Sequence, residues 1–144
     1  MLEQDYIMRI ILQYAQIIRR SWTKAGKGDD PLGAAELIEN QVGEATEIDG
    51  NVLLSLAPES IAGVMQVSGT DPQIADYISR SLLLEAQYLR EANKNDTAEL
   101  REAQAYAIAE AFGIELSLEA ITEEEWEELF AKSNPEKGTP APEA

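Results

Sequence analysis

The residues in this sequence that could do chemistry are glutamates set three positions apart. Two side chains at this spacing share one face of a helix, and carboxylate oxygens are ligands that Mg²⁺ and Mn²⁺ prefer. All-helical phosphohydrolases that hold magnesium in this way also need a Glu-x-x-Asp on a second helix, and this sequence has none. We interpret the pairs as solvated acidic faces, and a Mg²⁺- or Mn²⁺-dependent hydrolase of phosphorylated small molecules is the alternative. The pairs are Glu36/Glu39, Glu44/Glu47, Glu99/Glu102, Glu124/Glu127 and Glu125/Glu128.

The other side chains on which catalysis usually depends are missing. The sequence contains no histidine and no cysteine, which excludes a histidine general base, a thiolate nucleophile and a zinc–thiolate site. It also has no Gly-x-Ser-x-Gly motif and no glycine-rich phosphate loop. We therefore predict no catalytic residue, no metal ligand and no cofactor, and we expect a protein that is not an enzyme.

Charge is distributed unevenly along the chain. The net charge is −16, which disfavours nucleic acid as a partner. Residues 1–28 nevertheless carry five basic and two acidic residues, a net charge of +3, whereas the remaining 116 residues carry a net charge of −19. In this first segment the basic residues follow the apolar run, unlike those of a signal peptide, and they interrupt every stretch long enough to span a membrane. We expect a cytoplasmic protein.

Apolar spacing and helix-start signals predict an all-α fold of five to seven helices. The first helix covers residues 3–24, and Asp30-Pro31 opens a second that ends at Asp49-Gly50. A short helix and a further one starting at Pro58 follow, separated by a break near Ala57-Pro58. Later starts are predicted at Asp71-Pro72, at Asp96 with Glu99, and at Thr122 with Glu125, the last two as capping boxes.

The two Asp-Pro starts lie 41 residues apart, a separation typical of helical repeats. This spacing predicts stacked helical hairpins that resemble a short tetratricopeptide-like or α-solenoid bundle. Two amphipathic helices with similar starts would align equally well, so both explanations stay open. We divide the chain into a basic amphipathic first helix (1–28), an acidic body of helical hairpins (29–133) and a disordered tail (134–144).

The first helix is the segment to which we assign a function. Burying an isoleucine side chain is worth about 1.5–3 kcal/mol, so its five isoleucines must be covered by a partner. The partner is the core of the same chain, another protein or second copy of this chain, or a membrane surface, and these alternatives stay open. We predict an interaction or self-association domain, with docking on a membrane surface as a further alternative. The candidate interaction residues are Tyr6, Ile7, Arg9, Ile10, Ile11, Tyr14, Ile17, Ile18, Arg19, Arg20 and Trp22.

A family resemblance begins at the same helix. The residues Gln4-Asp5-Tyr6-Ile7-Met8-Arg9, followed by Ile10-Ile11, resemble the start of a family of small bacterial all-helical proteins known only as a domain of unknown function. The resemblance is specific over the first helix and general beyond it. It implies an acidic helical body with hairpins like those of tetratricopeptide proteins, and it implies no activity, ligand or functional residue.

Overall fold

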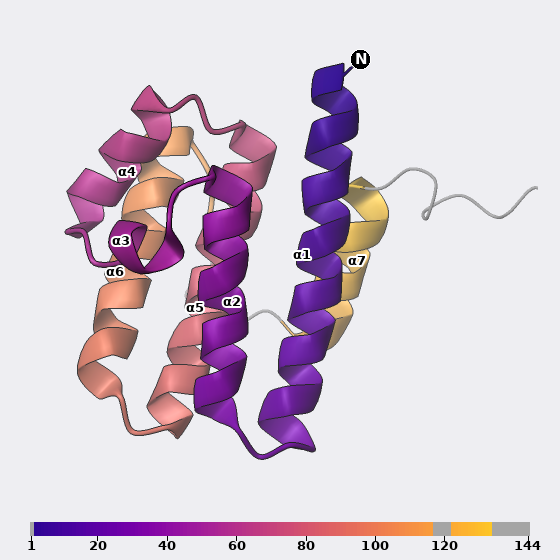
Figure 1. The fold of residues 1–144 in the computed structure, drawn as a ribbon, viewed down its shortest axis with the longest axis vertical. Coiled ribbons are helices and arrows are strands. Elements are labelled where there is room, and N and C mark those ends of the chain that lie inside the picture. Colours follow the sequence, from indigo (N-terminus) through magenta and orange to yellow (C-terminus); the bar gives the residue numbers. More distant parts are fainter. Residues whose placement is uncertain (1, 117–121, 134–144) are drawn as a thin grey trace, which may run out of the picture.

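Helices account for all the regular secondary structure in residues 2–116 and 122–133, the part of the chain that this computed structural model describes (Figure 1). Seven helices and no strand lie in these ranges, so the prediction of an all-α fold with five to seven helices is confirmed. The predicted disordered tail lies outside the described residues. The helices are α1 (Leu2–Gly26), α2 (Pro31–Thr46), α3 (Gly50–Leu53), α4 (Pro58–Val67), α5 (Pro72–Glu91), α6 (Asn95–Phe112) and α7 (Glu123–Ser133).

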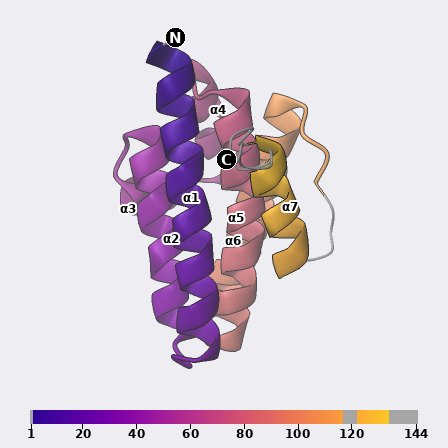
Figure 2. The ribbon, with the colours of Figure 1, turned by 90° about the vertical axis from the view of Figure 1, so that its right-hand side faces the viewer.

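Two antiparallel hairpins, α1–α2 and α5–α6, form the frame of the fold. They pack on each other mainly through α2 and α5, while α3 lies against α2 and α4 against α6. The short helix α7 lies beside α1 and α5, as Figure 2 shows. The 41-residue repeat that would relate α2 to α5 stays a prediction.

Side-chain caps define several of the helix starts. Asp30 accepts a hydrogen bond from the backbone N–H of Gly33 at 2.9 Å, and Asp71 accepts one from Gln73 at 2.8 Å. Each satisfies a backbone donor that the helix itself leaves unpaired. The capping box predicted at Thr122 and Glu125 is confirmed, because each residue's backbone N–H donates to the other's side chain.

Two predicted helix boundaries were wrong. Asp96 does not cap α6, which begins one residue earlier, at Asn95, and has no side-chain cap. Asp96 instead lies in the first turn, where a negative charge is favourable to the helix dipole. Asp49 does not end α2 either: that helix stops at Thr46 with Glu47 in the left-handed conformation, and Asp49 caps the start of α3.

The apolar face of α1 is part of the core of the same chain. Ile7, Ile10, Ile11, Tyr14 and Ile18 are each at most 7% exposed and pack against residues from the other helices. Burial of this face within the chain is the simplest of the three explanations that the sequence left open. The first helix is therefore an integral element of the fold.

The buried face that apolar spacing predicts for α6 is only partly right. The spacing in the sequence selects Leu100, Ala103, Ala107 and Ala111, with Ile108 and Phe112 alongside. Ile108 is buried as expected, but Ala103 is exposed, and Ala98 and Ala105, which were not selected, are buried in the core. The helix contains so many alanines that apolar spacing does not distinguish its faces. The buried face also contains Arg101 and Gln104, and a pattern search does not count such residues as core.

Four aromatic side chains fix α7 to the rest of the fold. Tyr77 of α5 contacts Tyr14 of α1, with ring centroids 5.9 Å apart, and stacks on Phe130 of α7 at 5.8 Å. Trp126 of α7 lies beside both Tyr77 and Phe130 and is 1% exposed. On the rim of this cluster, Arg19 donates two hydrogen bonds to Glu127, both 2.6 Å long.

Candidate interaction surface

Each of the five glutamate pairs has at least one carboxylate engaged in a contact within the chain. Three of these carboxylates receive hydrogen bonds from arginines on another helix, one from a tyrosine, and one from the backbone at the start of its own helix. The described residues contain no group of three or more acidic side chains that could hold a metal ion. The contacts are Glu39 with Arg101, Glu47 with Tyr6, Glu102 with Arg90, Glu127 with Arg19, and Glu125 with Thr122.

Arg101 is at the centre of a buried polar cluster, which we call the Arg101 cluster. Its guanidinium donates to Glu85 at 3.0 Å and to Glu39 at 3.2 Å. It also donates to the Leu54 carbonyl at 3.0 Å and to the side-chain oxygen of Gln104 at 3.2 Å. The cluster therefore joins α2, α5 and α6 to the loop that follows α3.

The backbone approach that positions the Leu54 carbonyl depends on two glycines. A side-chain carbon on Gly50 would lie 2.4 Å from the Glu39 carbonyl oxygen, and one on Gly43 would lie 2.9 Å from the Gly50 nitrogen. Only residues without a side chain allow α3 to lie this close to α2. Gln104 completes the attachment by donating to the carbonyls of Leu54 and Leu56, each at 2.9 Å.

Burial raises the pKa of Glu85 well above its ordinary value. The side chain is 0% exposed, and loss of solvation is the largest cause of the shift. The neighbouring Glu39 carboxylate also raises the pKa, while the positive charge of Arg101 lowers it. Burial thus disfavours the charged form of Glu85, and the Arg101 guanidinium 3.0 Å away favours it. The contacts of the Arg101 cluster are all internal to the chain, and we assign it a structural role.

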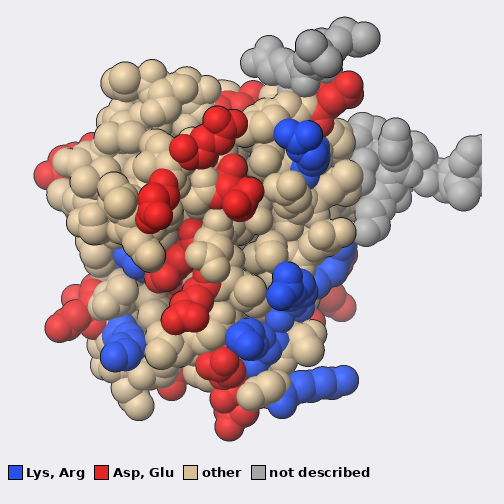
Figure 3. Space-filling view, viewed as in Figure 1, with Lys and Arg blue, Asp and Glu red and all other residues tan. Residues whose placement is uncertain are grey.

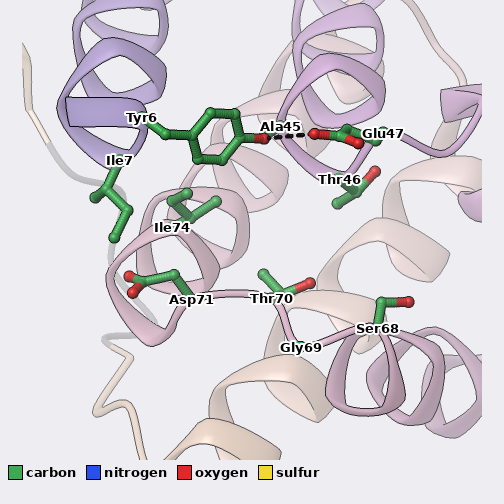
Figure 4. A pocket seen from close by; sticks show the side chains of 10 residues that line it. All are labelled: Tyr6, Ile7, Ala45, Thr46, Glu47, Ser68, Gly69, Thr70, Asp71 and Ile74. Carbon is green, nitrogen blue, oxygen red and sulfur yellow. Dashed lines mark hydrogen bonds between the residues drawn. The ribbon is translucent and has the colours of Figure 1, made fainter. Parts of the chain in front are cut away.

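A small hollow lies where the N-terminal part of α1 meets the end of α2 and the α4–α5 turn (Figure 4). Tyr6 lies across it and donates to Glu47 at 3.0 Å. Burial and this hydrogen bond both raise the pKa of Tyr6, so its phenol stays protonated and keeps donating. Arg9 lies over the Tyr6 ring, 5.4 Å from its centroid. These contacts join α1 to α2 at this end of the hairpin.

The eleven predicted interaction residues separate into three groups. Five are buried in the core of the same chain, so they are not at the surface of the folded molecule. Four more, Tyr6, Ile17, Arg19 and Trp22, are half-buried, and only Arg9 and Arg20 are exposed. Apart from Leu12, which is 42% exposed, and the exposed Asp5, the outer side of α1 is basic and polar. Docking of the folded chain through α1 must use this side. The buried five are Ile7, Ile10, Ile11, Tyr14 and Ile18.

The outer sides of α1 and α2 together form one surface with two columns of opposite charge, which we call the α1–α2 face. Figure 3 shows basic side chains over α1 and acidic side chains over the neighbouring α2. The spacing within each column is close to one turn, or whole turns, of a helix, so its members lie on one side. The α1 column consists of Arg9, Gln16, Arg20 and Lys24, and the α2 column of Glu36, Asn40, Glu44 and Glu47, all of them exposed.

Several charges on this face have no partner within the described residues. Arg20, Glu36 and Glu44 take part in no ion pair or hydrogen bond there. Lys24 lies 3.5 Å from Asp30, and both side chains are about half exposed. Between the columns, Arg20, Lys24 and the half-buried Leu37 line a shallow hollow. The face thus combines charges available for a partner with a small apolar contact near the α1–α2 turn.

The sequence indicated only part of this surface. The excess of positive charge in residues 1–28 is visible in the composition. The acidic column of α2 was also visible, as Glu36 and Glu44, but it was interpreted as an ordinary solvated face. What the sequence could not show is that the two columns lie side by side.

Known proteins supply no further guide to the function of this surface. Comparison of the chain with protein-family models, with curated proteins and with solved structures finds no match. Within the described part of the chain, no helix combines the length and apolar character needed to cross a membrane. The geometry and charge of the α1–α2 face therefore have to indicate what this chain binds.

Proposed function

We propose that this protein is a non-enzymatic interaction domain that docks on another protein surface through the α1–α2 face. The observation that carries the proposal is the separation of charge on that face. A chain with a net charge of −16 has a basic column directly beside an acidic one, and Arg20, Glu36 and Glu44 are unpaired within the described residues.

Electrostatics explains why such a face favours a partner. Neighbouring like charges within a column, such as Arg20 and Lys24, repel each other, because one helical turn of about 5.4 Å is shorter than the Debye length of about 8 Å at physiological salt. A partner with the opposite arrangement relieves the repulsion in both columns. Each exposed ion pair contributes about 0.2–1 kcal/mol, so the docking is reversible and depends on salt. Its specificity comes from the charge pattern.

Photo-crosslinking in cells tests this proposal. A photoreactive amino acid replaces Gln16, which lies in the middle of the basic column and is exposed. We expect irradiation to yield a discrete adduct between the full chain and a protein, because docking would hold the partner against this position. The matched control places the same amino acid at Ala103, which is exposed on α6 and away from the face. Equal adduct yields at the two positions would refute the proposal.

A further inference from the structure

We infer that the partner on the α1–α2 face is a second copy of this chain, bound with α1 of each copy over α2 of the other. This inference rests on the proposed function and adds the identity of the partner. It follows from the positions of the two columns relative to each other, the symmetry rules for identical chains, and the area of the face.

The two columns are aligned along their length. Residues 27–30 connect two antiparallel helices, so positions equally distant from this turn lie at about the same height. Two observations support this register: Arg20 and Leu37 line the same hollow near the turn, and Tyr6 is bonded to Glu47 at the far end. Arg20 is therefore level with Glu36 and Leu37, and Arg9 is level with the Glu44–Glu47 end of α2.

Symmetry allows two identical faces to meet in two simple ways. A two-fold axis across the helices would set α1 on α1 and α2 on α2, bringing like charges together along both contacts. A two-fold axis parallel to the helices sets α1 of each copy over α2 of the other. That axis preserves height, so Arg20 of one copy meets Glu36 of its partner, and Arg9 meets Glu44. Charge therefore selects the second arrangement.

The area of the face fits a reversible dimer. A helix rises 1.5 Å per residue and is about 10 Å wide with its side chains, so two helices of 16 to 25 residues cover about 500–750 Å². A standard interface buries about 800 Å² on each partner. The half-buried Leu37 adds an apolar contact near the turn-side end of the face. The face is thus close to the area a specific dimer needs, without the large apolar surface of an obligate one.

The overall charge of −16 gives the dimer an unusual dependence on salt. At very low ionic strength the charges of two whole copies repel each other at long range. At about 0.15 M salt the screening length falls to about 8 Å, so that mainly the facing columns interact. High salt then screens these contacts as well. We expect association to be strongest at intermediate ionic strength.

Sedimentation velocity on the full chain, with charge-reversed variants, tests the dimer. The first variant, Arg9→Glu with Arg20→Glu, makes both columns acidic, and the second, Glu36→Lys with Glu44→Lys, reverses only the α2 column. All four residues are exposed, so the fold is expected to persist. We expect wild type to dimerise reversibly and each variant alone to lose at least tenfold in affinity. An equimolar mixture of the two variants should dimerise again, because both contacts are then between opposite charges.

The control variant Glu99→Lys with Glu110→Lys changes the net charge by the same amount as the second variant, at exposed positions on α6. It should dimerise like wild type. The inference is overturned if wild type is monomeric at every concentration and salt, if either reversed variant still dimerises, or if the mixture does not. A monomer that pellets with vesicles containing phosphatidylserine would assign the face to a lipid surface and overturn it too. If the chain is a monomer and Gln16 crosslinks to a different protein, the inference of a second copy is wrong but the proposed function stands. If no crosslinked adduct forms at all, the proposed function is refuted as well.

Discussion

Replacing Arg101 with leucine is expected to lower the free energy of unfolding by about 3–5 kcal/mol, the usual cost of removing one member of a buried ion pair. The variant leaves Glu85, which is 0% exposed, without its cation. It also removes one of the two donors to the Leu54 carbonyl. Urea unfolding followed by circular dichroism measures the loss. A loss below about 1 kcal/mol would show that the cluster contributes little to stability.

Glu85→Gln is the matched control, because it keeps an oxygen that can accept from Arg101 but removes the buried charge. The pKa of Glu85 is raised on folding, so the folded chain binds this proton more tightly than the unfolded chain does. The contribution of Glu85 to stability therefore falls as pH rises from the unfolded pKa of about 4.3 towards the raised folded value. Relative to wild type, Glu85→Gln should gain stability over this pH range. A difference that stays constant from pH 4 to 8 would contradict the raised pKa.

Replacing Trp126 with alanine is expected to cost about 3–5 kcal/mol, as is usual for a large aromatic side chain removed from a core. Trp126 is 1% exposed and packs against Tyr77 and Phe130. Its loss would leave a cavity beneath α7 and weaken the contact that holds this helix against α1 and α5. Thermal and urea unfolding measured by circular dichroism give the size of the effect.

Glu124→Ala is the control for this variant, because Glu124 is exposed on the same helix. Its effect should stay within about 0.5 kcal/mol, as for most surface substitutions. If Trp126→Ala is as mild as this control, α7 does not contribute to the core in the way the aromatic contacts indicate.

Much of the fold could be predicted because its signals are local. The proline-led starts of α2 and α5 and the capping box at Thr122 each depend on neighbouring residues only. The apolar spacing of α1 likewise identified a buried face, since the pattern of a single helix is enough to show one.

The errors arose where structure depends on residues distant in sequence. Arg101 lies on the buried face of α6 because Glu39 and Glu85, on two other helices, compensate its charge. A pattern search assigns such a residue to the surface, and the face predicted for α6 was rotated accordingly. The spacing of Ala98, Arg101 and Ala105 places all three on one side of the helix, and this spacing could have indicated the buried face.

The candidate surface was predicted only in part for the same reason. The sequence singled out α1, and its basic residues Arg9 and Arg20 are exposed as an interaction surface requires. Four of the five isoleucines named with them are buried in the fold. An apolar face indicates burial without indicating the partner. The acidic column of α2 complements the basic column only because the folded hairpin places the two side by side, and the sequence of either helix alone does not show this.

Disulfide trapping tests the central claim most directly, because the chain has no cysteine of its own. Gln16→Cys places a single thiol in the basic column, and Asn40→Cys places one in the acidic column at nearly the same height. Since a disulfide requires Cα atoms within about 7 Å, only columns that face each other can crosslink efficiently. Under mild oxidation, a mixture of the two proteins should form the mixed disulfide dimer faster than either protein forms its own. The α1-over-α2 arrangement would be contradicted if Gln16→Cys formed a disulfide dimer with itself as fast as the mixture forms the mixed dimer. It would also be contradicted if the mixed dimer formed no faster than the disulfide dimer of an Ala103→Cys control.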